Sequence, residues 1–189
     1  MTEVVRTRDA LRDALATAER PVGLVPTMGW LHDGHRALMR QARAADATTV
    51  VSIFVNPRQF NVAADFTKYP RDEERDLAMC SDEGVDLVFA PGVEEIYPPG
   101  FDTAVSVGAV ARPLEGAARP GHFDGVATVV AILFNLVGAE RAYFGQKDAQ
   151  QVMVIRQMAR DLAIGTDVLA CPTDRERREH RALDGVELR

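Results

Sequence analysis

The chain has 189 residues, of which 47% are hydrophobic, so it is long enough for one domain with a sizeable core. Its formal net charge of −6 argues against a general nucleic-acid surface, and a site for an anion must build positive potential locally. No apolar run reaches the ~20 residues that span a bilayer, and charges of both signs between Thr2 and Glu19 argue against a signal peptide. The isolated Cys80 and Cys171 favour reduced thiols. We therefore expect a cytoplasmic protein with no membrane contact and no metal site built from cysteine and histidine.

Apolar runs rich in β-branched residues alternate with amphipathic segments along the chain. Helical spacing of apolar residues predicts helices over residues 7–18, 34–46, 72–83, 125–137 and 149–161. Short apolar runs predict strands over residues 22–25, 48–55, 85–90, 141–144 and 167–170, and a loop-rich stretch between them contains one further short strand at 103–107. This alternation predicts an α/β fold of one domain, with a Rossmann-like, doubly wound parallel sheet.

The segment 22–38 reads as a buried strand, a tight turn and the start of a helix. Pro26 and Gly29 end the strand, and we expect Gly34 to let the backbone turn closely into the helix. A helix N-terminus that follows a strand is a natural seat for phosphate. His32 and His35 are three residues apart, so both imidazoles lie on one side of the first helical turn, where they suit a developing negative charge on phosphorus.

A second motif is expected to meet this turn across the sheet. With a strand order of 3-2-1-4-5, ligands bind outside the carboxyl ends of strands 1 and 4, where the chain reverses direction. Strand 4 ends at Gly145, Gln146, Lys147 and Asp148. Lys147 is then either an ammonium for a polyphosphate or an ordinary surface lysine. Asp148 either accepts a hydrogen bond from a ribose hydroxyl or caps helix 149–161.

Three segments carry a resemblance to a known family. The string from Pro26 to His35, read as Pro-Thr-Met-Gly-x-Leu-His-x-Gly-His, resembles the motif of pantothenate synthetase (pantoate–β-alanine ligase), within the nucleotidylyl-transferring α/β superfamily. Asn56-Pro57-x-Gln59-Phe60 resembles a second segment of that family. Gly145 to Asp148, followed by Gln150-Gln151, resembles a third. The similarity covers about residues 20–173.

The resemblance implies roles for particular residues. It implies an ATP site formed by Met28, Gly29, Trp30, Leu31, His32, Asp33, Gly34, His35, Gly145, Gln146, Lys147 and Asp148. It implies that Gln59 and Gln151 bind pantoate, and that His35, with His32 and Lys147, is catalytic, His35 as the proton donor.

Further residues match family segments at the edge of this site. Arg119 and His122 match a segment beside the site, where a structural and a catalytic role are equally open. Tyr69 to Arg71 and Asp76 match a segment that borders the Mg²⁺-ATP region, and we assign no residue as a metal ligand.

The activity implied by the resemblance is ATP-dependent condensation of pantoate with β-alanine through a pantoyl-adenylate, with Mg²⁺, in a cytoplasmic homodimer. The expected ATP- and pantoate-binding domain spans residues 1–173. Residues 174–189 read as a divergent charged tail, a solvated helix or disordered, without the Met-Ser-Ser-Arg motif and C-terminal domain of the family. Two alternatives stay open: a catalytically impaired ATP- and pantoate-binding module that needs a separate C-terminal segment, and a plain nucleotidylyltransferase.

Overall fold

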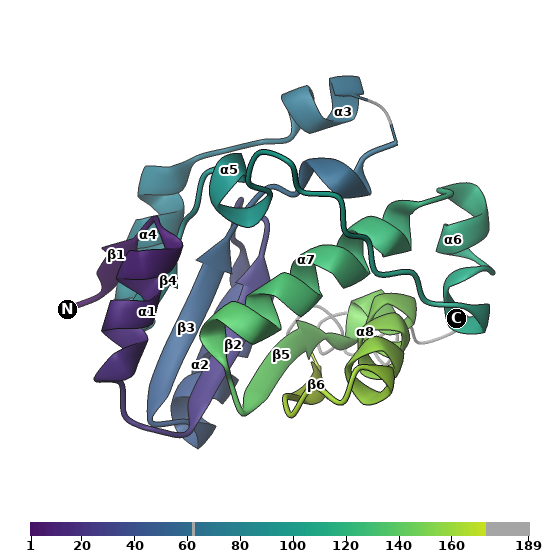
Figure 1. Ribbon diagram of the computed structural model, residues 1–189. Coiled ribbons are helices and arrows are strands. Elements are labelled where there is room, and N and C mark those ends of the chain that lie inside the picture. The colour runs from purple at the N-terminus through teal and green to yellow at the C-terminus, as the bar shows by residue number, and fades with distance from the viewer. Residues whose placement is uncertain (62, 173–189) are drawn as a thin grey trace, which may run out of the picture.

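A parallel six-stranded sheet forms the centre of the molecule (Figure 1). The computed structural model describes residues 1–61 and 63–172. The strands are β1 (Glu3–Val5), β2 (Val22–Thr27), β3 (Thr48–Ile53), β4 (Leu87–Phe89), β5 (Arg141–Gly145) and β6 (Asp167–Cys171), in the spatial order β1-β4-β3-β2-β5-β6. All pairings are parallel. The order in which strands are added reverses at β2, because β3 and β4 lie on one side of it and β5 and β6 on the other. The predicted order 3-2-1-4-5 of the five core strands is therefore confirmed.

Two details of the sheet differ from prediction. The edge strand β1 was not predicted, because it has only three residues, of which two are exposed, and so carries no alternating pattern. The predicted strand 103–107 is wrong: these residues form no strand. Their backbone is bound by a helix instead, since Val105 N–H donates to the hydroxyl of Thr128 at 2.9 Å.

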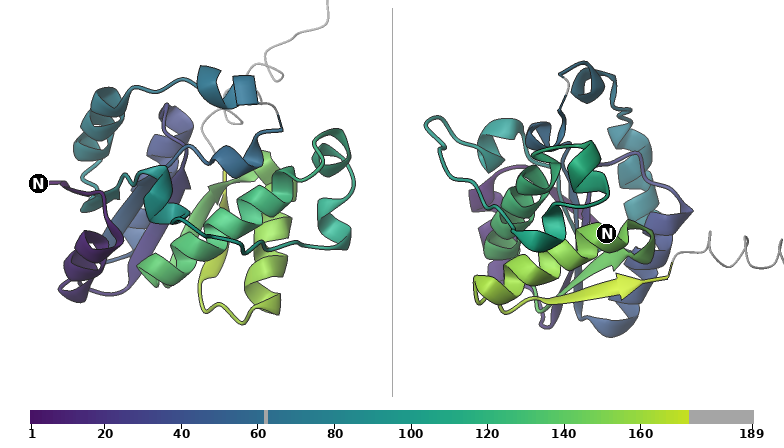
Figure 2. Two further views of the ribbon diagram at one scale, coloured as in Figure 1. Left: turned by 45° about the horizontal axis from the view of Figure 1, so that its top comes forward. Right: turned by 90° about the vertical axis from the view of Figure 1, so that its right-hand side faces the viewer.

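Helices cover both faces of the sheet, as Figure 2 shows. The helices α1 (Arg8–Ala16), α7 (His122–Val137) and α8 (Ala149–Asp161) lie on one face, and α2 (Asp33–Ala45) and α4 (Glu73–Asp82) on the other. Each face has its own cluster of buried apolar side chains, the first filled mainly by α7 and the second by α2 and α4. This three-layer arrangement confirms the doubly wound α/β fold.

The helix ends follow from local side chains. Thr7 accepts a hydrogen bond from the N–H of Ala10 and so caps α1, and Asp72 caps α4 in the same way. Helix α7 begins at His122, three residues before the predicted start, because Gly121 adopts a positive φ of 80° that ends the preceding turn. None of the helices within 1–61 and 63–172 is long and apolar enough to cross a membrane. The predicted tail at 174–189 lies outside the described residues.

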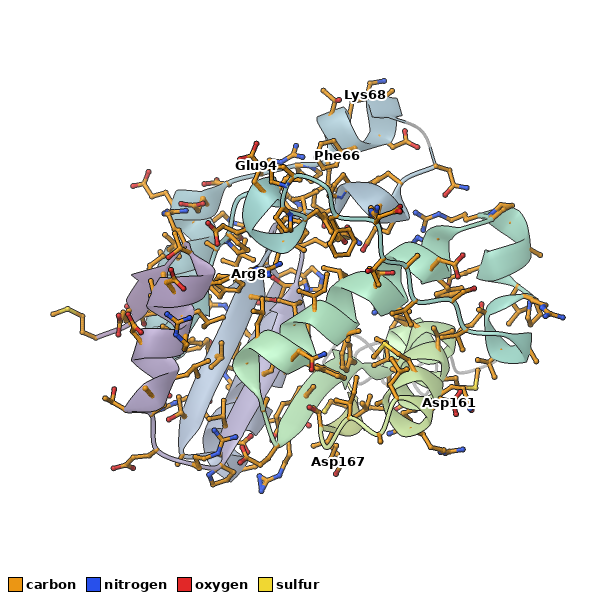
Figure 3. All side chains as sticks on the ribbon, viewed as in Figure 1. Arg8, Phe66, Lys68, Glu94, Asp161 and Asp167 are labelled. Carbon is orange, nitrogen blue, oxygen red and sulfur yellow. The ribbon has the colours of Figure 1, made fainter. Side chains whose placement is uncertain are left out.

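Short helices occupy the loops around the sheet. They are η1 (Pro57–Gln59), α3 (Ala63–Lys68), α5 (Val93–Ile96), η2 (Ala109–Ala111), α6 (Glu115–Ala118) and η3 (Gln146–Asp148). Figure 3 shows Phe66 and Lys68 of α3 and Glu94 of α5 above the edge where β2 and β3 end. Asp161 and Asp167 lie toward the opposite end of the molecule. The candidate site is at the edge where β2 and β3 end.

Candidate active site

The turn after β2 is a tight corner made by two residues with positive φ. Gly29 has a φ of 78° and Trp30 a φ of 52°. Gly29, which we expected to end the strand, makes this corner. Gly34, which we expected to turn the backbone into the helix, lies inside the first turn of α2, which already begins at Asp33, so that expectation is wrong.

A buried carboxylate from α4 holds this corner in place. Asp76 is 1% exposed, and its two oxygens accept hydrogen bonds from the backbone N–H groups of Trp30 and Leu31, both at 2.7 Å. A Cβ on Gly29 would lie 2.9 Å from Oδ2 of Asp76, so a side chain there has no room. The neighbouring Arg75 donates to the carbonyl of Leu31 at 2.9 Å, and its guanidinium lies 4.9 Å from the centre of the Trp30 ring. Helix α4 therefore sets the position of the motif.

The two motif histidines form a capping box at the start of α2. Nδ1 of His32 accepts from the N–H of Gly34 at 3.0 Å, and Nδ1 of His35 accepts from the N–H of His32 at 3.3 Å. Their ring centroids are 4.1 Å apart, as the three-residue spacing predicts. Because both Nδ1 atoms accept hydrogen bonds, each neutral ring carries its proton on Nε2.

Burial and, to a lesser extent, the nearby imidazole of His32 lower the pKa of His35 to about 4. His35 is therefore neutral at pH 7 in the unliganded chain. Its Nε2–H can donate a hydrogen bond to an oxygen anion, but the ring is not a charged acid until a bound anion raises its pKa.

A cavity of about 180 Å³ joins the two motifs. We call it the crevice; it is lined by Pro26, Thr27, Met28, His35, Phe54, Asn56, Gln59, Tyr69, Val126, Val129, Val130, Leu133, Phe144, Asp148 and Gln151. His35 comes from the first motif and Asp148 from the second, so the sheet brings them to one place. The predicted meeting of the two turns is therefore confirmed.

Other predicted residues lie around the crevice and do not line it. Lys147 and Gln146 are exposed on η3, next to Asp148. His32 and Asp33 line a second, more open hollow of about 440 Å³ between α2 and α4. His35 therefore lines the crevice, and His32 lines this hollow. The side chain of Leu31 is fully buried, which leaves its backbone as the part that a ligand could contact.

Gln59 lies at the end of η1, against the N-terminal part of α7. Its carbonyl oxygen contacts Nδ1 of His122 at 2.9 Å and accepts from the guanidinium of Arg119 at 3.2 Å. Arg119 and His122 therefore support the backbone that carries Gln59 and do not line the crevice. The close approach needs a glycine, because a Cβ on Gly125 would lie 2.3 Å from the carbonyl oxygen of Arg58.

Sequence reasoning missed two parts of the crevice. Helix 125–137 was predicted without a role in the site, yet one face of α7 forms the apolar wall of the crevice. Asn56 also lines the crevice and was noticed only as part of a motif. Gln151 of α8 lines the crevice as expected, whereas the adjacent Gln150 binds the loop that contains Val110 and Pro113.

Comparison with known proteins shows which family the chain belongs to. A family model described as pantoate-beta-alanine ligase matches residues 2–182. The chain belongs to the pantoate–β-alanine ligase family. The pantothenate synthetase of Roseiflexus castenholzii is 57% identical over 173 residues, which are 92% of this chain and 62% of that protein.

Solved structures of the family have the same fold. The pantoate–β-alanine ligase of Thermus thermophilus superposes with a TM-score of 0.86 at 53% identity, over 91% of this chain and 62% of that chain. The enzyme of Francisella tularensis, solved in complex with Beta-gamma ATP and β-alanine, superposes with a TM-score of 0.88 at 36% identity, over 91% of this chain and 67% of that chain. The present chain thus spans a little over three fifths of the length of its first relatives, 62% in the Roseiflexus protein.

Proposed function

We propose that this chain binds ATP and pantoate in the crevice and carries out the chemistry of a pantoate–β-alanine ligase. The observation that carries the proposal is the lining of the crevice, which combines the imidazole of His35 at a helix N-terminus with the side-chain amides of Gln59 and Gln151. The helix N-terminus with its imidazole suits a phosphate, and the amides suit the oxygens of a small organic acid. Family membership supports the same pairing of substrates.

Pantoate fits the part of the crevice between α7 and η1. It has a carboxylate, two hydroxyls and a carbon with two methyl groups. The methyl groups would pack against the valines of α7 and Phe54, and the amides of Gln59 and Gln151 would bind the oxygens. Neutral amides orient an anion without adding charge to the site.

ATP would lie across the imidazole pair. The α-phosphate would meet the N-terminus of α2 and the Nε2–H of His35, and the ammonium of Lys147 would reach the outer phosphates. Asp148, at the edge of the crevice, would accept a hydrogen bond from a ribose hydroxyl. Bound phosphate raises the pKa of His35, which makes it the proton donor in the transfer.

The reaction has two steps. A carboxylate oxygen of pantoate attacks the α-phosphorus, the bond from that phosphorus to the bridging oxygen breaks, and pyrophosphate leaves. The amine of β-alanine then attacks the acyl carbon, loses a proton and displaces AMP. The chain's contribution to both steps is to hold two anions together, through helix N–H groups, imidazole N–H groups and Lys147, while their repulsion is offset.

Magnesium is proposed as the counter-ion of the nucleotide substrate. Among residues 1–61 and 63–172, no group of three or more histidine, cysteine or acidic side chains could hold a metal ion. Mg²⁺ is commonly bound through phosphates, water and one or two carboxylates, so Mg-ATP fits a site whose lining includes Asp148. A homodimer and a cytoplasmic location remain predictions, and equilibrium sedimentation tests the first of them.

The assay that tests the proposal is pantoate-dependent release of pyrophosphate from Mg-ATP, with AMP appearing only after β-alanine is added. His35→Ala should abolish pyrophosphate release, while His122→Ala, which removes a contact to the backbone of Gln59, should retain more of it. Binding of both ligands without pyrophosphate would select the impaired-module alternative. Release that depends on a phosphorylated acceptor would select the nucleotidylyltransferase, although no arginine or lysine is found among the residues that line the crevice.

A further inference from the structure

The side-chain amide of Asn56 is held in one orientation by backbone groups. Its Oδ1 accepts from the N–H of Arg58 at 3.2 Å, and its Nδ2 donates to the carbonyl of Gly125 at 3.0 Å. A backbone N–H can only donate and a backbone carbonyl can only accept. The two ends of the Asn56 amide are therefore assigned by its neighbours.

The orientation of Asn56 determines that of Gln59. Nδ2 of Asn56 also lies 3.0 Å from the end of the Gln59 amide that faces it. Because Nδ2 is a donor, this end must be the acceptor, Oε1. The NH₂ end of Gln59 then faces the crevice, where its nearest partner is the sulfur of Met28 at 2.8 Å, a weak acceptor.

Tyr97 completes this set of hydrogen bonds from a distant part of the chain. Its hydroxyl donates to Oδ1 of Asn56 at 2.7 Å across a sequence separation of 41 residues. The ring is held between Phe54 and Phe101, with centroid distances of 6.1 and 5.1 Å, and the guanidinium of Arg58 lies 5.0 Å away. Burial raises the pKa of Tyr97 to about 12, so the hydroxyl keeps the proton that it donates.

We propose that Tyr97 and Asn56 are positioning residues that make the Gln59 amide a hydrogen-bond donor toward the crevice. The part of the crevice formed by Gln59 therefore selects a ligand oxygen that accepts a hydrogen bond, such as a carboxylate or hydroxyl oxygen. It disfavours an ammonium or amide group that donates one. The naming of pantoate as that ligand rests on the proposed function. The orientation of the two amides does not depend on the proposed function.

The side-chain amide protons of the unliganded chain report this arrangement directly in NMR hydrogen-exchange measurements. We expect slow exchange for the NH₂ of Asn56, because both of its acceptors are buried, and fast exchange for the NH₂ of Gln59. Tyr97→Phe removes one hydrogen bond, which corresponds to roughly 3- to 10-fold faster exchange at Asn56. The reverse pattern, or unchanged exchange in Tyr97→Phe, would overturn the proposal.

Tyr143→Phe is the matched control. It removes another buried hydroxyl, which is bound to Asp46 away from the crevice, and should lower stability without changing exchange at Asn56. Acceleration of that exchange equal to the Tyr97→Phe effect would count against a specific role for Tyr97.

Pantoate titration then separates the two proposals. Pantoate should shift the Gln59 NH₂ resonances, and its dissociation constant should rise roughly 3- to 10-fold in Tyr97→Phe but not in Tyr143→Phe. Equal affinity in Tyr97→Phe and the wild-type chain would overturn the positioning role. A wild-type chain with the expected exchange pattern and no response to pantoate would contradict the proposed function and leave the amide orientation established.

Discussion

The lowered pKa of His35 predicts that the folded chain loses stability in mild acid. The pKa is about 4 in the folded chain and near 6.5 in the unfolded chain, so the unfolded state binds more protons between these values. Stability that is fully present above pH 6.5 is therefore lost as the pH falls toward 4. The difference of 6.5 − 4 = 2.5 units, at about 1.36 kcal/mol each, corresponds to about 3 kcal/mol. Because the ring is partly exposed, we expect about 2 kcal/mol.

His35→Gln isolates this effect. Glutamine at the third helical position can accept from the backbone N–H of His32, as in a capping box, but it does not titrate. Urea unfolding followed by the fluorescence of Trp30, the one tryptophan in the sequence, measures the free energy of unfolding from pH 7.5 to 4.5. The two proteins should be similar at pH 7.5, and the wild-type chain should lose about 2 kcal/mol more by pH 4.5.

The comparison cancels other groups that titrate in the same range. Burial also lowers the pKa of His122, which adds a slope of the same sign to both proteins. Parallel stability curves for the wild-type chain and His35→Gln would refute the assignment of a neutral imidazole with a lowered pKa at His35.

Three further substitutions have separate expected effects. Asp76→Asn replaces one of two charge-assisted acceptors of the motif turn with a donor and should lower the free energy of unfolding by about 1.5–3 kcal/mol in urea titrations. Gly125→Ala places a Cβ against the carbonyl of Arg58 and should cost about 1–3 kcal/mol in the same assay, with weaker pantoate binding. Lys147→Ala removes an exposed ammonium, so the free energy of unfolding should stay within about 0.5 kcal/mol of the wild-type value. The affinity for ATP, measured by calorimetry, should fall.

Each of these substitutions has an informative failure. Wild-type stability in Asp76→Asn would show that α4 does not hold the motif turn. Unchanged stability and pantoate affinity in Gly125→Ala would contradict the close packing of α7 on η1. Unchanged ATP affinity in Lys147→Ala would show that Lys147 is an ordinary surface lysine, the alternative that its exposure leaves open.

Much of the fold follows from pattern alone. Alternating strands and helices, each long enough for a clear period, determine a parallel sheet, and the order of the five core strands was predicted correctly. The short elements were less accessible. The edge strand β1 depends on pairing with β4, and residues 103–107 have a strand-like composition but bond to a hydroxyl of α7. In both cases a tertiary contact decides the structure.

The candidate site was predictable where local motifs meet at the switch point of the sheet. His35 and Asp148 line one cavity, as the topology implied, together with Gln59 and Gln151, which the family resemblance pointed to. The contacts that position them come from distant parts of the chain. The hydrogen bond from the N–H of Leu31 to the Asp76 carboxylate, like that of Tyr97 to Asn56, joins residues more than 40 positions apart, at separations of 45 and 41. No spacing rule in the sequence indicates such pairs.

We propose that the imidazole turn and the two amides serve one reaction centre in the crevice. A crystal structure of the chain with pantoate and a non-hydrolysable ATP analogue tests it most directly. We predict a carboxylate oxygen of pantoate on the NH₂ of Gln59, with the α-phosphate beside Nε2 of His35. Pantoate or the nucleotide bound outside the crevice, or the two ligands on opposite sides of the sheet, would contradict the account.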